Sequence, residues 1–124
     1  MIICKITYRG WPGHFILGDR CRFRLNTLIE YGQKRIVVST VGLLVDRPAN
    51  QFEPIGNDRY YETMAFWATL IKDEWGEFWE ADVTQPIDFD SPWRWPSIKD
   101  ELKAQAGHEV VVQEIAGKLK EGIL

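Results

Sequence analysis

The hydrophobic pattern of this chain changes its period once, close to residue 97. Before that point, short runs of β-branched and aromatic residues alternate with polar residues, and clusters of glycine, proline and asparagine separate the runs. Alternation with a period of two is typical of strands that bury one face. After that point, apolar residues recur at three- and four-residue spacing, as in an amphipathic helix. The pattern predicts an α+β fold in which an antiparallel sheet comes first and helix follows.

The turn residues divide the sheet region into about five strands within a single domain, residues 1–124. We expect these strands in residues 2–9, 15–32, 33–45, 59–71 and 78–83, with loops at 47–58 and 84–96. Gly32 is expected at the left-handed position of a hairpin turn. Ser97 and Asp100 resemble the start of a capped helix. Gly107 predicts a break, so the C-terminal region is expected to form one or two helices.

Three arginines occupy alternate positions in one of these strands, and apolar residues fill the gaps: Arg20, Arg22 and Arg24 against Cys21, Phe23 and Leu25. We expect the apolar residues to face a core and the arginines to face outward. Residues 1–62 contain nine Lys or Arg and six Asp or Glu, whereas residues 63–124 contain six Lys or Arg and twelve Asp or Glu. A compact positive patch on a chain of net charge −3 fits a small anionic ligand better than a long nucleic acid. The alternative is that the arginines pair with acidic residues of the fold or of a neighbouring subunit.

The residue types argue against metal binding, catalysis and membrane insertion. His14 and His108 are far apart in sequence, and no Cys-x-x-Cys or His-x-x-x-His spacing occurs, so no metal or other cofactor is predicted. Cys21 has apolar neighbours on its strand face, which argues against a Cys21–His14 nucleophile and base. The acidic residues between 80 and 90 are typical of solvated loops, and we predict no catalytic residue. No apolar run is long enough to span a bilayer, so a soluble intracellular chain is expected.

Aromatic and polar residues point instead to ligand binding. Trp11 lies beside two glycines and a proline, where a ring is hard to bury, and a ring beside a guanidinium can hold a purine. Arginine binds phosphate bidentately. We therefore expect arginine on phosphate, Trp11 or Phe15 on a base, and Asn26 or Thr63 on ribose or base edges. The full predicted set of ligand-binding residues is Trp11, His14, Phe15, Arg22, Arg24, Asn26, Arg59, Tyr61 and Thr63.

Several segments also resemble a family of small phage and prophage proteins: YRGWPGHF at 8–15, CRFRLNTLIEYG at 21–32, RIVVSTVG at 35–42, IGNDRYYETMAF at 55–66 and WEADV at 79–83. Through them the chain resembles phage Thoeris anti-defence proteins of the signal-sponge kind. The resemblance implies a sheet with C-terminal helices, an oligomer, and sequestration of glycocyclic ADP-ribose made by bacterial TIR-domain enzymes. It also implies cyclic oligonucleotides as further ligands, and a non-catalytic role in the host cell cytoplasm.

A sponge removes about one ligand per site, so its affinity must be roughly nanomolar, near −12 kcal/mol. A pocket between subunits would exclude water well, and we expect the helical stripe Val111, Val112, Ile115 and Leu119 to pack across a homo-oligomer interface. Two other functions stay open. One is a protein inhibitor of the anti-CRISPR kind, which would imitate nucleic acid with its acidic second half and bind a host protein. The other is an enzyme acting on a nucleotide, which needs an adjacent acid and base.

Overall fold

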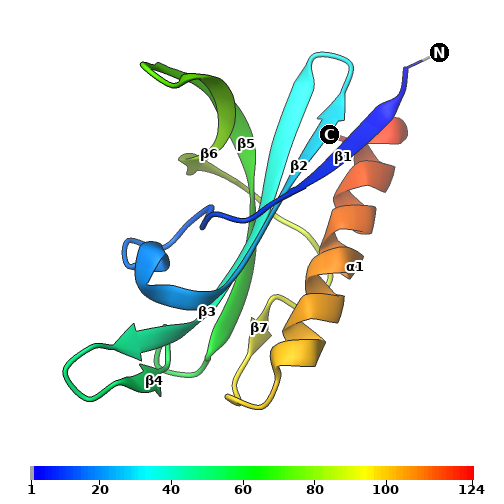
Figure 1. Cartoon of the computed structure of the whole chain (residues 1–124). Coiled ribbons are helices and arrows are strands. Elements are labelled where there is room, and N and C mark those ends of the chain that lie inside the picture. Colours follow the sequence, from blue (N-terminus) through cyan, green and yellow to red (C-terminus); the bar gives the residue numbers. More distant parts are fainter. Residues whose placement is uncertain (1) are drawn as a thin grey trace.

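The computed structural model describes residues 2–124 and shows a twisted sheet with one helix against it (Figure 1). The elements are β1 Cys4–Arg9, the short 3-10 helix η1 Gly18–Arg20, β2 Cys21–Tyr31, β3 Lys34–Asp46, β4 Gln51–Glu53, β5 Tyr61–Asp73, β6 Gly76–Ile87, β7 Arg94–Trp95 and α1 Glu101–Lys120. The main path of the sheet is β1-β2-β3-β5-β6, while β4 pairs with β3 and β7 with β5. All of these pairs are antiparallel. The α+β class and the order of sheet and helix are thus confirmed.

The strand limits differ from the predicted ones near the end of the sheet. β6 extends well beyond the predicted segment 78–83, because it resumes pairing after a register shift opposite Phe66 and Ala68 of β5. The two predicted loops contain the short strands β4 and β7. Gly32 has a φ of 61° in the turn between β2 and β3, so that prediction is confirmed.

The arginine segment follows its predicted alternation only in part. Arg22 and Arg24 lie in β2 and are exposed, as predicted. Arg20 lies in η1 instead, and its Nη2 donates to a backbone carbonyl of β3 at 2.7 Å. Cys21 and Phe23 belong to two separate apolar clusters. They do not share one core, because the alternation of β3 is interrupted opposite them at Leu43, which has a φ of 55°.

α1 covers one face of the sheet and buries its own apolar stripe there (Figure 1). The stripe predicted to pack across a subunit interface, Val111, Val112, Ile115 and Leu119, is almost completely buried against the chain's own sheet. Its partners include Ile29 of β2, Ile36 and Val38 of β3 and Ala65 of β5. The interface prediction was therefore wrong: the long central strands present enough apolar surface to cover the helix within one chain.

Neither the predicted cap nor the predicted break is found at its expected place. α1 begins at Glu101, and the side chain of its N-cap residue, Asp100, makes no hydrogen bond to the first turn of the helix. The Asp100 carboxylate accepts a hydrogen bond from the backbone N–H of Ser97 at 3.1 Å, and the Ser97 hydroxyl accepts one from Lys99 at 3.1 Å. With the hydrogen bond from the Asp100 N–H to the Ser97 carbonyl, these contacts form a turn that immediately precedes the helix. α1 continues through Gly107 without interruption. A Cβ at Gly107 would lie 2.1 Å from the Trp95 ring, so the glycine allows close packing of Trp95 rather than a bend.

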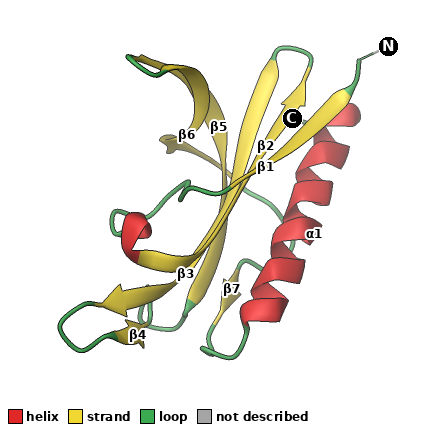
Figure 2. Ribbon diagram, viewed as in Figure 1, coloured by secondary structure: helices red, strands yellow, loops and turns green. Residues whose placement is uncertain are grey.

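The opposite face of the sheet is covered by the loop of residues 10–17, between β1 and η1 (Figure 2). β3 therefore lies between two layers, and nine successive residues of this strand, Ile36–Leu44, are buried. Such burial on both faces explains why its sequence is a continuous apolar run rather than an alternating one. Within residues 2–124, no helix has the length and apolar character required to cross a membrane.

Candidate ligand-binding pocket

A cavity of about 610 Å³ lies between the loop 10–17 and the sheet, on the face that α1 leaves uncovered. Small-molecule sites typically measure about 300–1,000 Å³. The larger apolar side chains on the lining are Trp11, Phe15, Ile16, Met64, Phe66 and Val83. The polar side chains on the lining are His14, Asn26, Glu62 and Glu80. The cavity thus combines broad apolar walls with a small number of hydrogen-bonding groups, as ligand sites do.

The loop that forms one wall of the cavity is fixed to the sheet by a close approach of its backbone. The N–H of Gly13 donates to the Ser39 hydroxyl at 3.1 Å. A Cβ at Gly13 would lie 2.6 Å from the Ser39 Cβ, so this contact requires glycine. Two residues later, Phe15 has a φ of 75°, a conformation that a bulky side chain rarely adopts. Such strain is found where the surrounding structure holds a segment in place, often at binding sites.

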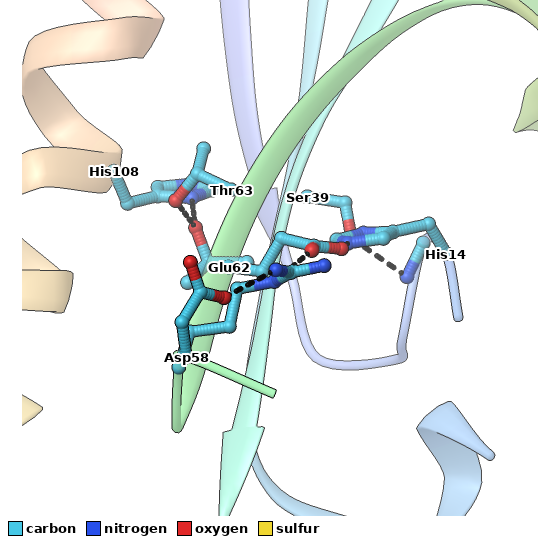
Figure 3. Close-up of polar contacts among 9 residues, drawn as sticks. His14, Ser39, Asp58, Glu62, Thr63 and His108 are labelled. Carbon is cyan, nitrogen blue, oxygen red and sulfur yellow. Dashed lines mark hydrogen bonds and ion pairs between the residues drawn. The ribbon is translucent and has the colours of Figure 1, made fainter. Parts of the chain in front are cut away.

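His14 connects this loop to β3 and β5 through what we call the cavity-side network, made of Ser39, His14, Glu62 and Arg59 (Figure 3). Its Nδ1 lies 2.7 Å from the Ser39 Oγ, and its Nε2 lies 2.9 Å from the Glu62 carboxylate. Because a carboxylate only accepts, Nε2 carries the hydrogen. Arg59 donates from Nε to the other carboxylate oxygen at 2.5 Å. Burial opposes ionisation of Glu62, but the contacts with His14 and Arg59 outweigh it and lower its pKa.

Serine, histidine and carboxylate are the members of a hydrolase triad, but here they do not expose a nucleophile. Ser39 is completely buried and is not on the cavity lining. Its Oγ is already engaged by both Gly13 and His14. Cys21, the other candidate nucleophile, is buried too, and burial raises its pKa to about 11. The cavity-side network therefore anchors the loop.

Arg9 joins the two edges of the sheet next to the cavity. Its Nε donates to the Asn26 Oδ1 at 2.9 Å, and its Nη1 donates to the carbonyl of Trp79 at 2.5 Å. Since β1 and β6 are the outer strands of the main path, the sheet curls around the cavity. The Arg9 guanidinium also lies 4.5 Å from the centre of the Trp11 ring. Burial lowers the pKa of Arg9, although Glu80 and a second carboxylate favour its charged form.

The predicted binding residues divide between the two faces of the sheet. Four of them line the cavity: Trp11, His14, Phe15 and Asn26. Arg59 is connected to the cavity through Glu62, and its guanidinium also pairs with Asp58. Arg22 and Arg24 are exposed and lie outside the lining. The structure therefore does not bring these two arginines, which were predicted to bind phosphate, to the aromatic rings predicted to stack on the base.

Tyr61 and Thr63 lie on the other face, beneath α1, which corrects their prediction as members of the same site. The Tyr61 hydroxyl donates to the carbonyl of Ile98 at 2.8 Å, and burial raises its pKa to about 12. Thr63 belongs to what we call the helix-side network, made of Thr27, Thr40, Thr63 and His108. The Thr40 hydroxyl lies 2.7 Å from that of Thr63 and 2.7 Å from the His108 Nδ1. Figure 3 shows the two networks on opposite sides of β5.

Sequence reasoning missed Arg9, Glu62, Met64, Phe66 and Glu80 as residues of this region. The alternation of β5 was a usable signal, because Glu62, Met64 and Phe66 share one face of that strand. No signal in the sequence pairs Arg9 with β6, since that contact depends on the curl of the sheet.

No group of three or more metal-binding side chains occurs within residues 2–124. Comparison of the chain with family models, with curated proteins and with solved structures finds no match. The resemblance to signal-sponge proteins therefore stays a hypothesis, and the geometry of the cavity is the basis for the proposals that follow.

Proposed function

We propose that this protein is a non-catalytic binding protein that sequesters a small nucleotide-type ligand in the cavity under the loop 10–17. The observation that carries the proposal is the cavity itself. Its aromatic walls include Trp11, Phe15 and Phe66, and hydrogen-bonding groups converge beside them. Flat aromatic ligands stack on such rings, and a nearby guanidinium strengthens the contact.

The first ligand to test is glycocyclic ADP-ribose, because the sequence resembles proteins that sequester it. The proposed setting is the cytoplasm of an infected host cell, where binding would lower the concentration of an immune signal. Cyclic oligonucleotides are less suited to this cavity, since Glu62 and Glu80 are on its lining and Arg22 and Arg24 are outside it. Carboxylates beside several phosphates would repel them.

A homo-oligomer remains part of the proposal, although α1 is not its interface. Ile16 and Val83 line the cavity and are 97% and 59% exposed. A second copy placed over this mouth would bury both side chains and exclude water from the ligand. Sedimentation at micromolar concentration tests this directly, and a monomer with and without ligand would contradict it.

The binding test is calorimetry with glycocyclic ADP-ribose, ADP-ribose and cyclic di- and trinucleotides. Heating the purified protein and identifying released molecules by mass spectrometry detects a ligand acquired in the cell. Trp11→Ala should weaken binding roughly 5- to 150-fold, because stacking contributes about 1–3 kcal/mol. Trp75→Ala is the matched control, since Trp75 is 87% exposed at the β5–β6 turn. Equal losses in both variants, or no binding to the wild type, would refute the proposal.

A second candidate function rests on that same turn. Trp75 is flanked by the exposed carboxylates Asp73, Glu74 and Glu77. An exposed tryptophan within acidic surroundings is a suitable anchor for a basic protein surface. This surface would serve the alternative function of a protein inhibitor that binds a host protein. The alternative predicts that Trp75→Ala abolishes binding of that partner while ligand binding in the cavity is unchanged.

A further inference from the structure

Asn26 is a buried amide on the cavity wall whose donor group finds no acceptor in the part of the chain that the structure describes. Asn26 is only 2% exposed, and its Nδ2 has no hydrogen-bond partner among residues 2–124. The Nη2 of Arg9 is also buried and has no partner within these described residues. Arg9 and Asn26 are cross-strand neighbours in β1 and β2 and contact each other, so the two nitrogens belong to one cluster. Buried donors are almost always paired, so this cluster calls for an explanation.

The orientation of the Asn26 amide follows from its neighbour. A guanidinium has only donors, so the Asn26 atom 2.9 Å from Arg9 Nε must be the oxygen. The Nδ2 group therefore points elsewhere. It lies 3.3 Å from the position of a Cβ built on Gly13, which places it beside the loop that forms one wall of the cavity. Both Asn26 and Gly13 are on the lining.

We propose that Arg9 and Asn26 form a subsite for a single oxyanion of the bound ligand, a carboxylate or a phosphate. The inference rests on the proposed function, because it assigns a part of the same ligand. Arg9 supplies the positive charge and Asn26 the directed N–H group, and each has one buried donor atom that an oxygen of the ligand would satisfy. The Trp11 ring against the guanidinium positions the flat part of the ligand next to this subsite.

The surrounding charges restrict the subsite to one anionic group. Glu80 is on the cavity lining and acts electrostatically on Arg9. Glu62 occupies another part of the lining, and its partner Arg59 also pairs with Asp58. A second phosphate would therefore meet carboxylates rather than a free cation. The preferred ligand has an aromatic ring and places one carboxylate or phosphate in the subsite, and any further phosphate, as in glycocyclic ADP-ribose, has to lie away from the carboxylate-lined wall.

The experiment compares adenosine, AMP and adenosine-5′-carboxylic acid by calorimetry. AMP or the carboxylic acid should bind the wild type at least tenfold more tightly than adenosine, and the stronger of the two identifies the oxyanion. Asn26→Asp replaces the donor by an acceptor of the same shape and should remove this advantage. The Arg9 contact should survive as an ion pair, so the melting temperature should not fall. Asn50→Asp, at an exposed turn, is the control for the added charge and should retain the advantage.

Arg9→Lys is the second variant, because it keeps the charge and removes the forked donors. It should also reduce the preference for the anion. If adenosine binds as tightly as AMP and the carboxylic acid, the oxyanion subsite is refuted while the cavity remains a binding site. If none of the three binds, the nucleotide proposal fails. The protein is then titrated with benzoate and with phenyl phosphate, and NMR monitors the chemical shift of the Asn26 side-chain amide. A change in this chemical shift supports the subsite, and an unchanged signal refutes it.

Discussion

Each face of the sheet has one histidine, and the two differ in what surrounds them. His14, on the cavity side, lies between a serine and a carboxylate that is itself paired with Arg59. His108, on the helix side, is 1% exposed and contacts the hydroxyls of Thr40 and Thr27, at 2.7 and 2.8 Å. Burial lowers the pKa of His108 to about 4.

This difference shows how neighbours decide what a buried histidine does. His108 is neutral and satisfies threonine hydroxyls in the middle of the core between α1 and the sheet. Because it is enclosed on every side, its contribution is to the stability of the fold. His14 is attached to a loop, lines a cavity and has an ionised partner. Its contribution is to the position of that loop and therefore to the ligand.

Replacing each histidine by alanine should separate these two roles most clearly. His108→Ala should lower the free energy of unfolding by about 3–5 kcal/mol, because it leaves a cavity and several unpaired buried hydroxyls. His14→Ala should cost about 1–2 kcal/mol, because mainly the loop 10–17 loses its attachment. Urea denaturation measures both values. Equal losses would show that the loop and the core unfold as one unit.

The pH dependence of stability offers a second test. The unfolded chain protonates His108 near pH 6.5, whereas the folded protein does so near pH 4. The stabilisation from neutral His108 is therefore complete above pH 6.5 and is lost as the pH falls toward 4. The loss should be about 3 kcal/mol, at about 1.4 kcal/mol for each pKa unit. Urea denaturation of the wild type and His108→Asn between pH 7 and 4.5 checks this, and an equal slope in both would contradict it.

Glycine substitutions compare the packing on the two faces. Gly107→Ala should cost about 1–3 kcal/mol of stability, because the added methyl would overlap the Trp95 ring under α1. Gly13→Ala should instead displace the loop from Ser39 and weaken ligand binding. Gly117→Ala is the control within α1, since no atom of residues 2–124 lies within 4 Å of its Cβ position, and it should stabilise the helix by up to about 1 kcal/mol. Thermal melts and calorimetry on the three variants distinguish these effects.

The predictions that held are those that depend on local sequence. Periodicity identified the strands and the helix, although α1 begins at Glu101 rather than directly after Ser97. The predictions that failed depend on which residues meet across the fold. Gly107 looked like a helix break because its packing partner Trp95 is not visible in the pattern. Thr63 looked like a binding residue because alternation defines two faces of β5 without saying which one α1 covers.

Some of the residues that line the cavity could be predicted from the sequence, but their interaction partners could not. Trp11, His14, Phe15 and Asn26 were found because loop chemistry and residue type are local properties. The partners of these residues come from remote segments: Glu62 is 48 residues from His14, and Trp79 is 70 residues from Arg9. Such pairs follow from strand register and from the curl of the sheet, and neither is encoded in the spacing of one segment.

The smallest effect is expected at the arginines that first suggested a phosphate site. Arg22 and Arg24 are exposed on β2 and outside the cavity lining, so Arg22→Ala and Arg24→Ala should each change stability by less than about 0.5 kcal/mol. The affinity for a ligand in the cavity should change less than twofold, as measured by calorimetry. A tenfold loss in Arg24→Ala would instead mean that the ligand extends along β2. Arg24 and Asn26 share one face of that strand, so a phosphate beyond the loop would then be held by the arginine face after all.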